Sequence, residues 1–390
     1  MLEHLFVVPE DPLLRLIGAF KSDKRADKID LGVGVYRNEQ GLTPVMEAVK
    51  RAEHILLETQ DSKAYIGLAG DVEFLDEMGH LVFGGIRPKK SRFAYLQTPG
   101  ASAALRLGGD IIKRSNDDAT IWIGLPCWSN HIPIFNAAKL KIETYSYYDE
   151  QKRRLDQNAV FEALKTAKTG DIILLQGCCH NPTGVDFSPS DWVDISRICV
   201  ERGLIPFIDM AYQGLGHGLS EDLQGLNVIM ETVPEALIAV SCSKNFGLYR
   251  ERTGALYVMA PTIEKAKISL TNLFDLARTS YSMPPDHGAA IVKTILRSPE
   301  LKQLWENELR HMRKRIAATR QAIIENCGTE RFGYMQSDQG MFSLLPLTAS
   351  QIARLRDDHA IYMAGNGRIN IAGLKPDSIG QFSDALHSVL

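Results

Sequence analysis

The stretch ALIAVSCSKNFGLYRERTGALYVMA, residues 236–260, places a polar turn between two short apolar runs. Both runs are rich in aliphatic residues and bounded by Ser or Gly, which is typical of buried β-strands. Lys244 follows the first run behind two serines, and Arg252 lies just before the second. Lysines usually lie on solvated surfaces, and taken alone Lys244 could be such a loop residue. Its place at the end of a buried strand is the feature to explain.

Similar runs alternate with helical patterns from about residue 93 to residue 260. The strand-like runs are RFAYLQT, TIWIGLP, DIILLQGCC, LIPFIDM, ALIAVSCS and GALYVMA. Between two of them, SPSDWVDISRICVERG predicts a helix that Ser188 or Ser190 caps and Gly203 ends. Apolar strands that alternate with helices favour an α/β fold with a mostly parallel sheet and right-handed crossovers.

The remainder of the chain predicts a second, smaller α/β domain. Residues 298–328 have the pattern of one long amphipathic helix that ends at a glycine, and hairpin-like pieces follow it. We therefore expect a large cofactor-binding domain over residues 45–311. Residues 1–44, as an N-terminal arm, and residues 312–390 would form the small domain.

Composition excludes several classes of protein. The 390 residues carry a net charge of −3, with a sequence pI of about 6.4, which gives no electrostatic reason to bind nucleic acid or an anionic membrane. No apolar run approaches the length of a membrane helix, and no signal peptide is recognisable. The six cysteines form no CxxC pair, so we expect no metal site and reduced thiols in a cytoplasmic protein.

Polar side chains follow several predicted strands at the point where each strand ends. Asn181, Asp209 and Lys244 each follow one, and PGASAAL after RFAYLQT forms a glycine turn into a helix at Ser102. Alone, Asn181 or Asp209 could simply satisfy a turn. Because carboxyl ends of parallel strands share one edge of a sheet, we expect all of these groups to lie together, with an anion site at the glycine turn.

The glycine-rich segments do not match a nucleotide-binding motif. GLGHGL and GVGVYR both lack the glycine at the sixth position of the dinucleotide fingerprint GxGxxG, and neither a Walker-type loop nor HExxH is present. An amine, a carboxylate and an anion site instead suit pyridoxal phosphate. This cofactor needs an amine to hold its aldehyde as a Schiff base, an acid beside its ring nitrogen and a phosphate pocket. Ser241 and Ser243 point the same way on an extended chain, and Arg252 can grip a phosphate with two bonds.

These segments resemble the class I aminotransferases, in the branch that acts on aspartate and aromatic amino acids. The resemblance extends from DLGVGVYR through YIGLAG, CCHNPTG, DMAYQG, SKNFGLYRERTGAL and SYSMPPDHGA to GRINIAG. It implies the fold-type I architecture, with a mostly parallel seven-stranded sheet in the large domain. It also implies a homodimer whose active sites lie at the interface between subunits.

The resemblance further implies a role for each matching residue. Lys244 would hold the cofactor and move the substrate proton, Asp209 would partner the ring nitrogen, and Tyr212 with Asn181 would face the ring oxygen. Trp128 and Ala211 would lie on the two faces of the ring, and Trp128 and Asn181 would also line the substrate site. The phosphate cradle would consist of Gly100, Ala101, Ser102, Ser241, Ser243, Arg252 and, from the neighbouring subunit, Tyr65.

Two arginines would bind substrate carboxylates according to the same resemblance. Arg368, assisted by backbone near Gly34, would bind the α-carboxylate, and Arg278 from the other subunit would bind a side-chain carboxylate. The expected reaction is a ping-pong exchange in which an amino acid leaves as a 2-oxo acid and 2-oxoglutarate accepts the amino group. The substrates would be aromatic amino acids or aspartate.

Several alternatives stay open. A strict aspartate aminotransferase is one, and decarboxylation, elimination or cyclisation on the same fold is another, although two carboxylate-binding arginines favour transamination. A non-catalytic binding protein is a third. The sequence also departs from the family's usual phosphate turn at Ala101 and Ala103, and Cys242 stands where an aromatic residue is common. SCSKNFG together with RERTG resembles the aromatic branch more than the strict aspartate enzymes.

Overall fold

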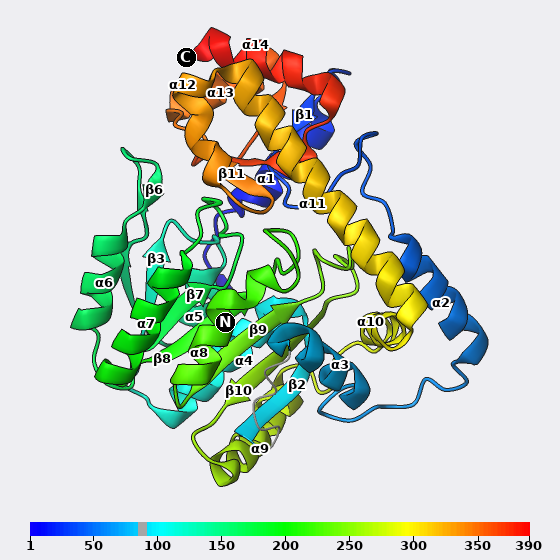
Figure 1. Ribbon diagram of the computed structural model, residues 1–390, viewed down its shortest axis with the longest axis vertical. Helices are drawn as coiled ribbons and strands as arrows, with labels where there is room; N and C mark the ends of the chain where they lie inside the picture. The colour runs from blue at the N-terminus through cyan, green and yellow to red at the C-terminus, as the bar shows by residue number, and fades with distance from the viewer. Residues whose placement is uncertain (85–91) are drawn as a thin grey trace. The chain divides into compact units, whose positions relative to one another are not determined.

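The computed structural model describes residues 1–84 and 92–390, which form two compact units (Figure 1). The large unit consists of Pro44–Lys314 and Asp338–Gly340. The small unit consists of Met1–Thr43, Arg315–Ser337 and Met341–Leu390. The short segment 338–340 thus folds with the large unit, where Gln339 N–H donates to Gly184 O over 2.6 Å.

A seven-stranded sheet forms the centre of the large unit, in the order β2-β10-β9-β8-β7-β3-β4. Its strands are β2 (Phe93–Pro99), β3 (Thr120–Leu125), β4 (Lys141–Ser146), β7 (Ile172–Gln176), β8 (Ile205–Met210), β9 (Ala236–Ser241) and β10 (Thr253–Met259). β10 is antiparallel to both of its neighbours, and the other pairs are parallel. The predicted mostly parallel α/β sheet is confirmed.

One strand of the sheet, β4, was absent from the sequence-based prediction. β4 reads KIETYS at the edge of the sheet, and most of its side chains are exposed. Every residue of β7, β9 and β10 is buried, by contrast, because helices lie over both faces of the sheet (Figure 1). Continuous apolar runs therefore identified the central strands, whereas a polar edge strand resembles a loop.

Helices of the large unit connect and cover these strands. They are α2 (Glu47–Thr59), α3 (Val72–Phe83), α4 (Gly100–Ser115), α5 (His131–Ala137), α6 (Gln157–Thr166), α7 (Pro189–Arg202), α8 (Gln224–Thr232), α9 (Ile263–Ser280) and α10 (His287–Arg297). A small ribbon pairs β5 (Tyr148–Asp149) with β6 (Arg154–Leu155). A core of aliphatic and aromatic side chains fills the space between the sheet and the helices α4, α5 and α9.

Helix ends follow the capping signals in the sequence. The side chain of Ser188 accepts the N–H of Asp191 and the Asp191 carboxylate accepts the N–H of Ser188, so α7 begins with a full capping box. Gly203 ends α7 in the left-handed conformation, with φ at 66°. The predicted long helix is α11 (Pro299–Cys327), which ends before Gly328 and is the element that continues from the large unit into the small one.

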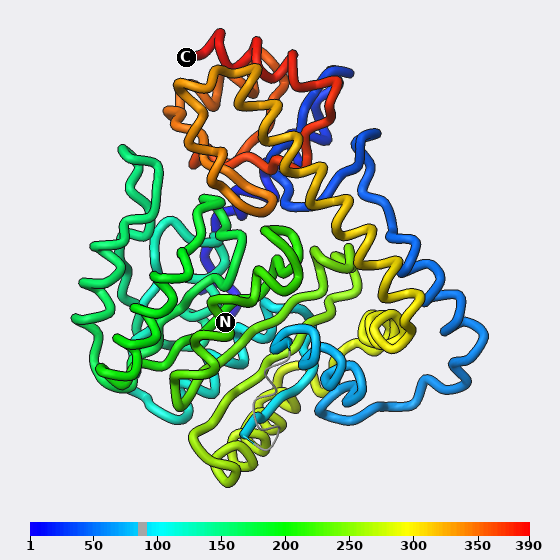
Figure 2. The backbone as a smooth tube through the Cα atoms, viewed as in Figure 1, coloured from blue at the N-terminus to red at the C-terminus, as the bar shows by residue number. Residues whose placement is uncertain are grey.

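The small unit joins the two ends of the chain. β1 (Ile29–Asp30) pairs in parallel with β12 (Ile361–Tyr362), and β11 (Phe342–Leu344) pairs in antiparallel with β13 (Arg368–Asn370). Its helices are α1 (Pro12–Ser22), α12 (Thr329–Phe332), α13 (Ala349–His359) and α14 (Ile379–Val389). The colours of Figure 2 show blue N-terminal chain among the orange and red C-terminal segments of this unit.

The hairpin-like pieces expected after the long helix include IYMAGNGRINIAG, residues 361–373, and this segment does not pair with itself. Its first strand, β12, pairs with the N-terminal β1, and its second strand, β13, pairs with β11. In its pairing with the distant β1, both residues of β12, Ile361 and Tyr362, are buried. Within the described residues, no helix is both long and apolar enough to cross a membrane.

Candidate active site

The carboxyl ends of β7, β8 and β9 lie beside one another at one edge of the sheet, as their register shows. Asn181 follows β7, Asp209 is the second-to-last residue of β8, and Lys244 follows β9. Because β10 is antiparallel, its start lies at the same edge, and it brings Arg252 there. The structure therefore places these four predicted residues together in the large unit.

Lys244 has an amine that is easily deprotonated. Burial lowers the pKa of Lys244 to about 8, an effect that the charge of Asp209 opposes and that of Arg252 reinforces. Its Nζ lies 4.8 Å from the centre of the Tyr212 ring. The turn after Lys244 is held by α11, since Trp305 Nε1 donates to Asn245 O over 2.8 Å and the Trp305 ring stacks on Phe246 at 4.4 Å.

Asp209 is a buried carboxylate with two different oxygens. Oδ2 lies 3.0 Å from His131 Nε2, at the start of α5, whereas Oδ1 is buried and receives no hydrogen bond from the described residues. A buried carboxylate oxygen without a donor is costly, and a protonated ring nitrogen would supply that donor. The pair of Lys244 and Asp209 thus fits pyridoxal phosphate. His131 was missed from the sequence, because only the packing of α5 brings it to Asp209.

Asn181 and Tyr212 form a second polar pair at this edge. Asn181 Nδ2 donates to Tyr212 Oη over 3.3 Å, and both residues are buried. Ala211 is buried between Asp209 and Tyr212 in the chain. Trp128 follows β3 and meets the His131 ring edge-on at 5.3 Å, which links it to Asp209. The structure therefore brings these predicted ring contacts to the same place.

The predicted phosphate cradle lies at the start of α4. Gly100, Ala101 and Ser102 form its first turn, where backbone N–H groups and the helix dipole favour an anion. The Arg252 guanidinium packs over Gly100, at 2.6 Å from the position that a β-carbon there would take. The buried Ser241 Oγ accepts the N–H of Ser243 over 3.1 Å. Although Ala101 departs from the family's usual turn, α4 begins at Gly100 without interruption.

This geometry agrees with what is known of related proteins. A model of the family described as aminotransferase class I and II matches residues 26–386. The chain belongs to this aminotransferase family. It is 51% identical over 377 residues to tyrosine aminotransferase of Rhizobium meliloti (strain 1021), with 96% of each chain covered.

Two further relatives support the assignment. The chain is 40% identical over 398 residues to aspartate aminotransferase of Escherichia coli (strain K12), with both chains fully covered. The structure of aromatic-amino-acid aminotransferase from Burkholderia pseudomallei, covalently bound to pyridoxal phosphate, matches with a TM-score of 0.97. That protein is 35% identical, and the match covers 100% of this chain and 99% of that one. The predicted transaminase class and the fold-type I architecture are confirmed.

Two predicted site residues of the aminotransferase, Tyr65 and Arg278, do not contact Lys244 or Asp209 within the described chain. Tyr65, in the segment between α2 and α3, is 93% exposed. Arg278, in the last turn of α9, is also exposed and donates from Nη1 to Ser282 Oγ. Within the described residues of this single chain, neither is in hydrogen-bond contact with Lys244 or Asp209. Their predicted roles across subunits stay predictions.

The small unit of the aminotransferase holds the predicted carboxylate site. Arg368 at the start of β13 donates from Nη2 to Gly32 O over 2.6 Å, and its guanidinium lies over the Phe342 ring at 4.6 Å. Gly34 lies against the same ring. Asn370 Nδ2 donates to the carbonyls of Val33 and Val35, which fixes the backbone around Gly34. Arg368 and Gly34 are therefore neighbours, as predicted.

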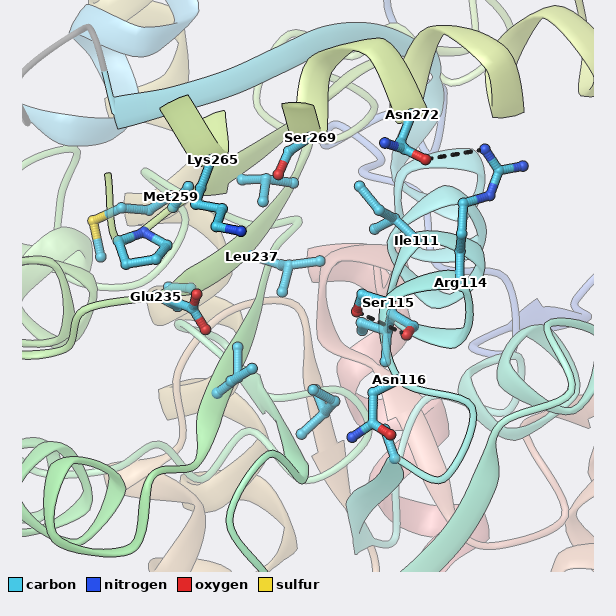
Figure 3. A pocket seen from close by; sticks show the side chains of 18 of the residues that line it. Ile111, Arg114, Ser115, Asn116, Glu235, Leu237, Met259, Lys265, Ser269 and Asn272 are labelled. Carbon is cyan, nitrogen blue, oxygen red and sulfur yellow. Dashed lines mark hydrogen bonds between the residues drawn. The ribbon is translucent and has the colours of Figure 1, made fainter. Parts of the chain in front are cut away.

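A separate cavity of about 520 Å³ lies at the opposite edge of the same sheet, between α4 and α9 (Figure 3). Aliphatic side chains such as Ile112, Ile172 and Leu237 form much of its wall, and Lys265 and Glu235 lie at its polar end. None of the predicted site residues lines it. We therefore place the candidate active site at the edge that carries Lys244.

Proposed function

We propose that this aminotransferase exchanges the amino group between an aromatic amino acid or aspartate and 2-oxoglutarate by a ping-pong mechanism, with pyridoxal phosphate as cofactor. One observation carries the proposal. At one edge of the sheet, an amine with a pKa of about 8 lies near a buried carboxylate that has one oxygen without a donor. Relatives named for tyrosine, aromatic amino acids and aspartate support this substrate range.

The large unit would hold the cofactor at four places. Arg252, the serines and the first turn of α4 would bind the phosphate, together with the partner subunit's Tyr65. Asp209 Oδ1 would bind the ring nitrogen, because Oδ2 is already taken by His131. Asn181 and Tyr212 would donate to the ring oxygen, and Trp128 and Ala211 would cover the ring faces.

Lys244 is the residue that moves protons. When bound, pyridoxal phosphate supplies an electron-poor ring that stabilises negative charge on the substrate α-carbon. Lys244 Nζ would hold the aldehyde of the cofactor covalently and would be free to act as a base when substrate is bound. With a pKa of about 8, Nζ is neutral in about half of the molecules at pH 8, so it would accept the α-proton and return it on the other side of the exchange. Asp209 Oδ1 would keep a proton at the ring nitrogen, because it has no other donor among the described residues.

Two arginines select the substrate. Arg368, held against Gly32 and Phe342, binds the α-carboxylate that every amino acid carries. Arg278 pairs with the side-chain carboxylate of aspartate or glutamate. An aromatic ring can enter the same space when Arg278 swings out into solvent, where its exposed side chain keeps its hydration.

We also propose that the protein is a homodimer that works in the cytoplasm. Its sites would combine Lys244 of one subunit with Tyr65 and Arg278 of the other. The exposure of both residues in the single chain supports this arrangement. All six cysteines are unpaired thiols, which suits a reducing compartment.

Steady-state kinetics with aspartate, tyrosine, phenylalanine and tryptophan against 2-oxoglutarate tests the proposed function. We expect turnover of aspartate and of at least tyrosine and phenylalanine. Turnover of aspartate alone would identify a strict aspartate aminotransferase. Protein that stays colourless with added pyridoxal phosphate, and that has no turnover, would contradict the enzyme itself.

A further inference from the structure

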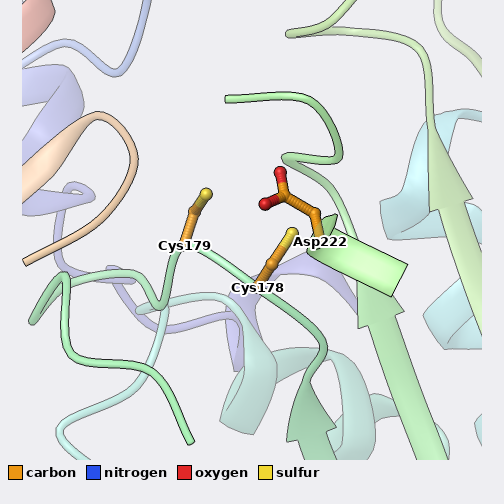
Figure 4. Close-up of side chains that lie close together, drawn as sticks. All are labelled: Cys178, Cys179 and Asp222. Atoms are coloured by element: carbon orange, nitrogen blue, oxygen red, sulfur yellow. The ribbon is translucent and has the colours of Figure 1, made fainter. Parts of the chain in front are cut away.

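Cys178, Cys179 and Asp222 lie close together behind the active site, and all three are buried (Figure 4). Their potential ligand atoms are within 4.8 Å of one another, as in a metal site. The carboxylate, however, is already fully bonded by the protein. Its two oxygens accept four backbone N–H groups, which fills the acceptor sites of a carboxylate. The cluster therefore has another use.

The four donors come from one glycine-rich loop. Oδ2 of Asp222 accepts the N–H groups of Gly214 and Gly216 over 2.8 and 3.0 Å. Oδ1 accepts those of His217 and Gly218 over 2.7 and 3.3 Å. A β-carbon on Gly216 would lie 2.7 Å from Oδ1. In the segment GLGHG, which matches no nucleotide-binding motif, a glycine at position 216 thus leaves room for the backbone to wrap around this carboxylate.

This loop begins at Tyr212. Leu215 N–H donates to Tyr212 O over 3.0 Å, which closes a tight turn, and Gly214 occupies it with φ at 91°. A turn of this kind requires a residue with positive φ at its third position. Asp222 binds the N–H of that same glycine. Two peptide units therefore connect Tyr212 to the glycine that Asp222 binds. Tyr212 Oη in turn accepts a hydrogen bond from Asn181 Nδ2.

We propose that Asp222 is a positioning residue for Tyr212: its carboxylate anchors the 214–218 loop and thereby aims the tyrosine hydroxyl at the ring oxygen of the cofactor. This inference rests on the proposed function, which places Tyr212 against the cofactor. Asp222 acts through the loop and does not itself touch the reacting atoms.

The carboxylate is better suited to this task than its amide. Hydrogen bonds to an ionised acceptor are stronger than neutral ones. In asparagine an NH₂ group replaces one of the two carboxylate oxygens. This NH₂ group can only donate, so it would lose the hydrogen bonds from the two backbone N–H groups that the replaced oxygen accepts. In Asp222→Asn, half of the loop would lose its anchor while the volume of the side chain stays the same.

The test is a visible-absorbance pH titration of the bound cofactor in the holoenzyme. Tyr212→Phe removes a donor to the ring oxygen, so we expect its titration midpoint to rise by about one unit. Asp222→Asn should raise the midpoint in the same direction. In the double variant Asp222→Asn/Tyr212→Phe, the midpoint should equal that of Tyr212→Phe alone, because Asp222 acts through Tyr212.

Asp171→Asn is a matched control at the opposite edge of the sheet. Asp171 is also buried and accepts the N–H groups of Thr120 and Lys168 and the Nε1–H of Trp122. Its replacement should lower the melting temperature and leave the titration midpoint unchanged. If Asp222→Asn does not fold, Gly216→Ala supplies the milder test, since its β-carbon pushes on the same carboxylate.

Three outcomes would overturn the inference. A midpoint that Asp222→Asn leaves unchanged while Tyr212→Phe moves it would refute the inference alone. Additive shifts in the double variant would show that Asp222 acts independently of Tyr212. A midpoint that even Tyr212→Phe does not move would contradict the proposed place of Tyr212, and the inference with it.

Discussion

An amine surrounded by protein loses much of the hydration that stabilises its charged form, and at Lys244 this lowers the pKa to about 8 from an ordinary value of 10.5. Asp209 opposes the shift and Arg252 adds to it. Both of these neighbours are also predicted to bind the cofactor. The residues that hold the cofactor therefore also set the charge of the amine that reacts with it.

Covalent uptake of pyridoxal phosphate by the apoenzyme should depend on this pKa. Only the neutral amine attacks an aldehyde, so the rate should fall about tenfold for each pH unit below 8 and level off above it. Stopped-flow absorbance measures the rate, and butylamine under the same conditions corrects for protonation of the cofactor. Lys244→Ala should bind the cofactor without the covalent band and should not turn over. A rate that still climbs toward pH 10.5 would show an amine with an unshifted pKa.

We propose that substrate choice also depends on one residue, Arg278. Arg278→Leu should lower kcat/KM for aspartate, because the variant loses a charge pair worth roughly 2 to 5 kcal/mol and each ~1.4 kcal/mol corresponds to a factor of ten. The kcat/KM for phenylalanine should change little, because phenylalanine has no side-chain carboxylate. Steady-state kinetics with both substrates measures this difference. Arg114→Leu is the control. Arg114, in α4, forms an ion pair with Asp275, which lies in the same helix as Arg278, α9, and this pair is far from Lys244. Equal losses for both substrates would assign Arg278 to folding or assembly.

Whether a helix or strand could be predicted from the sequence depended on how deeply it is buried. The strand ends were predictable, because buried strands are apolar and the residues that interrupt them stand out. The edge strand β4 was not, since its side chains face solvent. His131 was not either, because it lies 78 residues from Asp209 in the chain and only the packing of α5 joins them. The anchoring of the GLGHG loop was missed for a different reason: Asp222 lies close to the loop in the chain, but no sequence motif marks a carboxylate that accepts several backbone N–H groups.

The contact between β10 and α4 gives a prediction at this scale. A β-carbon on Gly254 would lie 2.4 Å from Val240 O and 2.9 Å from Gly100 Cα, and such backbone atoms cannot move aside as a side chain can. Gly254→Ala should therefore destabilise the large unit by about 1 to 3 kcal/mol and displace the first turn of α4. Thermal unfolding of the apoenzyme and fluorescence titration with pyridoxal phosphate measure the two effects.

Gly79→Ala is the control for this prediction. Gly79 lies in α3 of the same unit, and a β-carbon there would make only ordinary contacts with Tyr257 and Phe83. It should keep both stability and cofactor affinity. If Gly254→Ala also kept both, the close approach of β10 to Gly100 would have no energetic consequence.

The whole molecule exposes apolar side chains where a second subunit is proposed to bind. Leu57 and Tyr65 are 82% and 93% exposed, and Ile66 is 37% exposed, in and just after α2. A contiguous patch of exposed apolar side chains is typical of an interaction surface, and we propose that these residues belong to one. Arg278 is exposed as well, although the proposed function needs it beside a substrate. A dimer with shared sites would bury these apolar side chains and place Arg278 beside the substrate bound in the other subunit.

Hybrid dimers test the shared site. Lys244→Ala and Arg278→Leu homodimers should both be nearly inactive toward aspartate. If each site combines Lys244 of one subunit with Arg278 of the other, a hybrid dimer has one site with both defects and one site with neither. Unfolding and refolding the two variants together should then restore aspartate turnover toward half the wild-type rate per hybrid, whereas each variant refolded alone stays inactive. Native mass spectrometry establishes that hybrids have formed. Hybrids without restored turnover would place Lys244 and Arg278 in the same subunit's site, because every site would then keep one defect.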